Sequence, residues 1–108
     1  MFASSVYDLS LNNWDTSNVT NMSHMFSGND YFNQPLDNWD VSKVTDMSGM
    51  FFKDTAFNQD LSGWDTSNVT NMSSMFYKAS RFNQSLNNWD TSKVTDMHEM
   101  FYEALINP

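Results

Sequence analysis

The feature that most constrains this chain is a tryptophan that recurs every 25 residues. Four tryptophans occur in the 108-residue sequence, and the same 25-residue step separates each from the next. A fixed period of this length is typical of proteins in which each repeat is one structural unit that stacks on its copies. We therefore expect residues 1–108 to form a single solenoid domain of four rungs, where a rung is one 25-residue repeat. The rungs are centred on Trp14, Trp39, Trp64 and Trp89.

Other apolar residues keep the same register as the tryptophans. Each rung carries about seven large apolar side chains, and burying them is worth roughly 10–20 kcal/mol. Fixing the backbone of one rung costs roughly 25–50 kcal/mol, so one rung should not fold alone and must stack on its neighbours. The apolar rows are Leu11, Leu36, Leu61, Leu86; Val19, Val44, Val69, Val94; Met22, Met47, Met72, Met97; Met25, Met50, Met75, Met100; Phe26, Phe51, Phe76, Phe101; and Tyr7, Phe32, Phe57, Phe82.

The spacing within a rung predicts its secondary structure. Met22, Met25 and Phe26 follow the i, i+3, i+4 pattern of one helix face. The preceding Asn-Val-Thr or Lys-Val-Thr has one apolar residue between polar ones, which favours a very short parallel strand. The remaining polar residues would form a return loop. The predicted fold class is an α/β repeat solenoid with one short strand, one short helix and one loop in each rung.

Polar residues also recur in register, and some of them suit a structural role. Asn33, Asn58 and Asn83 would lie about 4.8 Å apart in stacked rungs, and each is followed by a glutamine. Their side-chain amides can both donate and accept hydrogen bonds. We therefore expect amide ladders that bond the backbone of the turns, beside the ladder of tryptophans.

Composition excludes several classes of function. Thirteen acidic residues against five basic ones give a net charge of −8, which opposes binding to nucleic-acid phosphates. There is no cysteine for a disulfide or a thiolate metal site. No apolar run approaches the roughly 20 residues of a membrane span. His24 and His98 occupy different repeat positions, and no nucleophile triad or phosphate loop occurs. The sequence predicts neither an enzyme nor a cofactor.

The best candidate binding residues flank the predicted strand and would face solvent. Rungs one and three carry Asn where rungs two and four carry Lys, which avoids stacking like charges that would repel by about 1 kcal/mol. The lysines are also spaced to pair with Asp46 and Asp96. The candidate rows are Asn18, Lys43, Asn68, Lys93 and Thr20, Thr45, Thr70, Thr95.

Two other rows leave alternatives open. An aspartate follows each Trp, and a Ser two positions later suits a turn in which the carboxylate accepts a backbone N–H; a calcium site is the alternative. These aspartates are Asp15, Asp40, Asp65 and Asp90. Threonines at 16, 66 and 91, interrupted by Val41, would lie beside the Thr20 row. A flat face lined by both rows would suit ice binding, which is a minor alternative.

The stretch FNQDLSGWDTSNVTNMSSMF resembles the repeat of BspA-like surface proteins, which are found in mycoplasma lipoproteins and Gram-positive cell-surface proteins. The resemblance covers essentially the whole chain. It implies a leucine-rich-repeat-like solenoid that is displayed outside the cell, where adhesion is commonly inferred. It brings no catalytic residues.

Two functions follow as expectations. The first is a non-catalytic extracellular module that binds a protein or a glycan in adhesion. The second is a structural protomer that associates end to end through its terminal rungs into a filament or scaffold. Because the sequence begins and ends within the repeat pattern, we also expect the chain to be part of a longer array.

Overall fold

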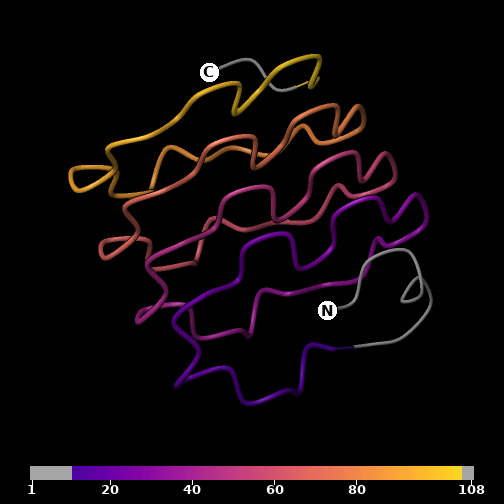
Figure 1. Cartoon of the computed structure of the whole chain (residues 1–108). Coiled ribbons are helices and arrows are strands. Elements are labelled where there is room, and N and C mark those ends of the chain that lie inside the picture. Colours follow the sequence, from indigo (N-terminus) through magenta and orange to yellow (C-terminus); the bar gives the residue numbers. More distant parts are fainter. Residues whose placement is uncertain (1–10, 106–108) are drawn as a thin grey trace.

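The chain winds in successive circuits that lie one above the other in sequence order, from the indigo end to the yellow end in Figure 1. A computed structural model of the chain describes residues 11–105; Tyr7, which we assigned to an aromatic row, lies outside them. Backbone hydrogen bonds join residues 24–26 positions apart, so that each circuit corresponds to one 25-residue rung.

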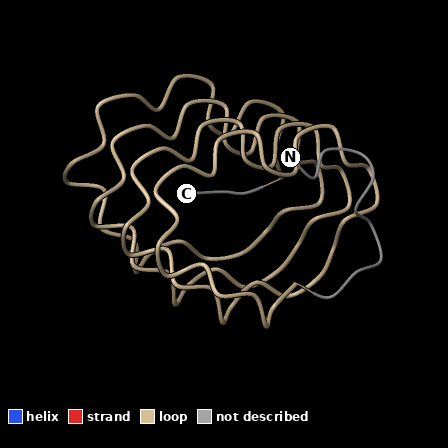
Figure 2. Cartoon of the chain, turned by 60° about the horizontal axis from the view of Figure 1, so that its bottom comes forward, coloured by secondary structure: helices blue, strands red, loops and turns tan. Residues whose placement is uncertain are grey.

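The predicted α/β solenoid is wrong, because the rungs contain neither helices nor strands. Between residues 11 and 105 the chain consists of turns, bends and irregular segments, which Figure 2 draws entirely as loop. Regular pairing is limited in that range to isolated parallel bridges between Asn21 and Asp46, Asp46 and Asn71, and Asn71 and Asp96. None of the described residues belongs to a helix that could cross a membrane.

The backbone hydrogen bonds explain why the Met-x-x-Met-Phe segment is not a helix. Every second N–H, beginning at Met25, donates to the carbonyl oxygen three residues earlier, which closes a tight turn. The N–H groups between them, beginning at Met22, donate instead to carbonyls of the next rung at 2.7–2.9 Å. An α-helix needs every N–H to bond four residues back within its own segment. Here half of the donors are used to join rungs.

This arrangement requires left-handed backbone at two positions in every rung. The two positions are four residues apart, and φ at them lies between 53° and 73°. Glycine occupies only Gly28 and Gly49, although other residues adopt such φ at a cost of roughly 1–2 kcal/mol each. The remaining residues with positive φ are His24, Lys53, Ser74, Lys78, Glu99 and Glu103.

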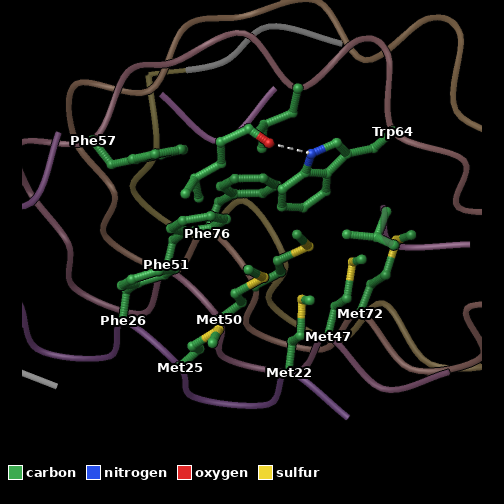
Figure 3. Close-up of a cluster of buried hydrophobic side chains, with 14 of the residues drawn as sticks. Met22, Met25, Phe26, Met47, Met50, Phe51, Phe57, Trp64, Met72 and Phe76 are labelled. Carbon is green, nitrogen blue, oxygen red and sulfur yellow. Dashed lines mark hydrogen bonds between the residues drawn. The ribbon is translucent and has the colours of Figure 1, made fainter. Parts of the chain in front are cut away.

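The core lies inside the circuits and consists of stacked rows of identical residues (Figure 3). Two phenylalanines of one rung stack face to face, as Phe51 and Phe57 do at 4.1 Å between ring centroids. Phe51 also stacks on Phe76 of the next rung at 5.5 Å. Offset stacking of this kind adds to the free energy of burial. The methionines of both rows lie beside this aromatic column and are fully or almost fully buried up to Met75.

Each buried tryptophan ties its rung to the one before. The indole N–H of Trp64 donates to the carbonyl oxygen of Leu36 at 3.0 Å, and Trp39 and Trp89 make the same bond to Leu11 and Leu61. The three rings are 3–8% exposed, whereas Trp14 is 44% exposed. Each of these leucine carbonyls also accepts the backbone N–H three residues on, so the indole N–H is its second donor.

Amide side chains join the rungs at another position. The N–H of Asn58 donates to Oδ1 of Asn33 at 2.9 Å, and Gln59 Nε2 donates to the same oxygen at 3.0 Å. Asn83 and Gln84 repeat both bonds to Asn58. Asn33, Asn58 and Asn83 thus form a hydrogen-bonded row along the stack.

Replacing one buried indole tests the role of the tryptophan row. Trp64→Phe removes the indole donor from the buried Leu36 carbonyl, which keeps only the N–H of Trp39, and leaves an empty space in the core, so we expect the free energy of unfolding to fall by about 2–4 kcal/mol. Urea denaturation followed by circular dichroism measures the change. Tyr102→Phe, which removes a hydroxyl from a side chain that is 46% exposed, should change stability by less than about 0.5 kcal/mol. Equal losses in the two variants would contradict this role.

Candidate functional site

The predicted asparagine–lysine row is exposed and is joined by side-chain hydrogen bonds. Lys43 Nζ donates to Asn18 Oδ1 at 3.2 Å, and Lys93 Nζ donates to Asn68 Oδ1 at 3.1 Å. The expected pairing of these two lysines with Asp46 and Asp96 is wrong, because ion pairs in the described part of the chain involve other residues. The row presents amide and ammonium groups alternately along the stack.

The threonine row beside it is exposed and regular. In each rung after the first, the threonine N–H and hydroxyl both donate to the carbonyl oxygen of the threonine one rung earlier. The N–H bond measures 2.8 Å at all three junctions. Each hydroxyl oxygen keeps lone pairs that point away from this bond and can accept from a partner. The row consists of Thr20, Thr45, Thr70 and Thr95.

The other threonine row does not extend this surface. Thr16 and Thr66 are 4% and 1% exposed, and their hydroxyls donate to the main-chain carbonyls of Asp40 and Asp90. Val41 is also buried at this position, so only Thr91 is exposed. The described residues therefore lack the flat face with two threonine rows that the minor alternative of ice binding would need. The hydroxyls at 16 and 66 satisfy the backbone of the next rung.

The aspartate after each tryptophan forms a turn. Asp15 Oδ1 accepts from the hydroxyl of Ser17 at 2.6 Å and from its N–H at 3.0 Å, and these bonds lower the pKa of Asp15 below its ordinary value. The pKa of Asp65 is lowered in the same way by Ser67, although Asp40 and Asp90 oppose the shift. No three histidine, aspartate or glutamate side chains within residues 11–105 come close enough to hold a metal ion.

Sequence reasoning missed a surface at which the rungs differ from one another. We call it the variable segment: residues 27–31 and their equivalents 52–56, 77–81 and 102–105. Its aromatic rings form a partly exposed stack, with Phe52 4.6 Å from Tyr77 and Tyr77 4.9 Å from Tyr102. Lys53 lies 5.3 Å above the Phe52 ring, and Lys78 lies 5.6 Å above the Tyr77 ring. The signal in the sequence was the loss of repetition at these positions.

A surface hollow of about 430 Å³ lies within the variable segment. We call it the Ala56 hollow, because the small side chain of Ala56 stands at the repeat position taken by Tyr31 one rung earlier and Arg81 one rung later. Tyr31 is 70% exposed. The lining residues are Asp30, Tyr31, Thr55, Ala56, Ser80 and Arg81.

One acidic group in the variable segment is buried. The side chain of Asp54 is inaccessible to solvent; Oδ1 accepts from the N–H of Ala56 at 3.3 Å, and Oδ2 has no hydrogen-bond partner. Burial, reinforced by the nearby charge of Asp30, raises the pKa of Asp54 to about 8. Asn29 and Ala79 occupy this position in the neighbouring rungs, so the stack accepts an uncharged residue there.

The family model described as "Mycoplasma protein of unknown function, DUF285" matches residues 1–107. The chain belongs to this family. The match spans all four tryptophans and includes every residue that the structure describes. No curated protein and no solved structure matches the chain.

The buried carboxyl of Asp54 makes stability depend on pH. Between its ordinary pKa of 3.8 and its folded pKa of about 8, the folded state holds a proton that the unfolded state releases, so stability falls as pH rises through this window. Asp54→Asn removes the titration. We expect this variant to differ little from the parent near pH 4 and to be more stable at pH 8, by an amount on the order of a few kcal/mol.

Thermal denaturation at several pH values between 4 and 9 measures this difference. Asp60→Asn is the matched control. Hydrogen bonds from Ser62 lower the pKa of exposed Asp60, so its effect of pH on stability has the opposite sign to that of Asp54. The Asp60 carboxylate stabilises the fold above the unfolded pKa, and that contribution disappears as pH falls through the folded value. A parent and an Asp54→Asn variant that differ by the same amount at every pH would show that Asp54 does not titrate in this window.

Proposed function

We propose that this chain is a non-catalytic repeat module that is displayed outside the cell and binds a protein or a glycan in adhesion. The observation that supports it is the exposed pair of rows, asparagine–lysine and threonine, in which inter-rung hydrogen bonds hold the polar groups at a constant spacing. Preorganised groups lose little conformational entropy on binding. A surface of this kind suits a partner whose own groups recur along its length.

The repeat itself supports the same proposal. The segment FNQDLSGWDTSNVTNMSSMF resembles BspA-like surface proteins, and the DUF285 family is described as a Mycoplasma protein family. We infer that the two are related and that this chain shares the extracellular setting of the BspA-like proteins. The net charge of −8 disfavours nucleic acid as the partner.

The rows can be tested by exchanging residues that the repeat already accepts. The double variant Lys43→Asn, Lys93→Asn gives rungs two and four the residue of rungs one and three, so the fold should be unchanged. Binding to immobilised fibronectin, laminin and collagen, and to a printed glycan array, is measured by fluorescence. We expect at least one ligand to bind the parent and to bind this variant about tenfold more weakly or worse.

Lys53→Asn, Lys78→Asn is the matched control, since it removes the same charge from another part of the surface. An equal loss in the control would assign the effect to net charge, and unchanged binding in the row variant would remove the rows from the interface. Failure of the parent chain to bind any probe on either surface would count against the adhesion role.

A second candidate function is end-to-end association into a filament or scaffold. Met97 is 45% exposed, whereas Met22, Met47 and Met72 at the same repeat position are completely buried by the next rung. Beside it lies a groove of about 500 Å³ that contains Leu86, Trp89 and Phe101. A rung from a second copy of the chain would cover this face as rungs cover one another within the stack.

Sedimentation velocity over a range of concentrations tests the second candidate. We expect the mass of the parent to grow with concentration, and Met97→Glu to remain monomeric because the carboxylate would be buried at the junction. Tyr31→Glu, which changes a residue that is 70% exposed and far from this face in the rung order, should associate like the parent. A parent that stays monomeric at every concentration would rule out association through this face.

A further inference from the structure

The Ala56 hollow is built from residues that do not repeat from rung to rung. By contrast, the threonine row carries the same residue in successive rungs and the asparagine–lysine row carries two alternating residues. Around the hollow, three rungs contribute three different side chains at one position, Tyr31, Ala56 and Arg81, and three more at the position before it, Asp30, Thr55 and Ser80. The core does not require this variety, because none of the six side chains belongs to the buried cluster of stacked rows.

The small residue in the middle creates the space. Had position 56 carried a tyrosine or an arginine like its neighbours, a long side chain would lie between Tyr31 and Arg81. With Ala56 there, about 430 Å³ is open to solvent, which falls within the range of roughly 300–1,000 Å³ typical of small-molecule sites. The hollow can therefore admit a compact ligand between an aromatic ring and a guanidinium group.

The lining offers two kinds of contact at once. The ring of Tyr31 is largely exposed and provides an apolar face. The hydroxyls of Thr55 and Ser80 can each donate and accept, the carboxylate of Asp30 accepts, and the guanidinium of Arg81 donates. Arg81 forms no ion pair with any described residue. A ligand that fits must present an apolar face on one side and several groups that both donate and accept on the other.

We propose that the Ala56 hollow is a saccharide-binding site that holds one sugar ring. The C–H face of a pyranose packs on the ring of Tyr31, and its hydroxyls, which both donate and accept, bond to Thr55, Ser80 and Asp30. Arg81 donates to a ring hydroxyl or, in a uronic acid, to the carboxylate. An amino-acid side chain of a protein partner would bring at most three polar atoms into the hollow, and no side chain offers as many groups that both donate and accept.

This inference rests on the binding role proposed above but not on the asparagine–lysine and threonine rows. The hollow differs from those rows in its chemistry, and it lies at other repeat positions. The aromatic stack nearby is a separate surface, in which the ring of Tyr77 lies between those of Phe52 and Tyr102, and none of the three rings lines the hollow. Tyr31 supplies the aromatic ring that lines the hollow, and this residue is 70% exposed.

Saturation-transfer NMR with the whole chain tests the site, using the methyl glycosides of glucose, galactose, N-acetylglucosamine and glucuronic acid as probes. We expect at least one of these sugars to bind the parent. Ala56→Tyr fills the hollow with a residue that the same position carries one rung earlier, and it should lower affinity at least tenfold. Tyr31→Ala should have a similar effect. Tyr102→Ala, which removes an exposed aromatic ring outside the hollow, should bind like the parent.

Arg81→Gln separates the two ligand types within the class. A loss confined to the glucuronide shows that Arg81 pairs with the carboxylate, and an equal loss for all sugars shows that it bonds to a hydroxyl; both outcomes support the site. The proposal is overturned if no sugar binds, or if Ala56→Tyr binds as well as the parent. Binding that is lost in Lys43→Asn, Lys93→Asn but kept in Ala56→Tyr would overturn this site and leave the proposed function in place.

Discussion

The division of backbone N–H groups between two tasks is the interaction on which the rest of the structure depends. In the segment that begins at Met22, alternate amides close turns within the rung and the others bond to the next rung. Each rung thus supplies its neighbour with four hydrogen bonds without forming a strand. Because these bonds run along the stack, identical residues lie above one another, and the phenylalanine and methionine rows become continuous columns.

Side chains add further hydrogen bonds from one rung to the backbone of another. The indole of Trp64, the amide of Gln59 and the hydroxyl of Thr66 each donate to a carbonyl of an adjacent rung. Buried carbonyls without partners would cost about 1–3 kcal/mol each. The repetition of polar residues is therefore as much a requirement of the fold as the repetition of apolar ones, and most of the exposed asparagines and threonines take part in it.

The same requirement divides the surface into two kinds of region. Rows such as Thr20 and its equivalents repeat because each threonine bonds to the one before, so they offer a periodic set of groups. The variable segment lies beyond the inward-facing Phe26 row and is freer to differ between rungs. It contains the aromatic stack, the Ala56 hollow and the buried carboxyl of Asp54, which are the features that distinguish one rung from another.

The sequence by itself determined the length of the rung and the residues that face the core, because the 25-residue register of Trp, Leu, Met and Phe has only one consistent reading. It also placed the amide row of Asn33, Asn58 and Asn83. Tertiary structure decided the local conformation. The spacing of Met22, Met25 and Phe26 is the same in a helix and in a pair of successive turns, and the choice between them depends on hydrogen-bond acceptors in the next rung. The Ala56 hollow was likewise decided in three dimensions, since Tyr31, Ala56 and Arg81 are 25 residues apart in sequence and become neighbours only when the rungs stack.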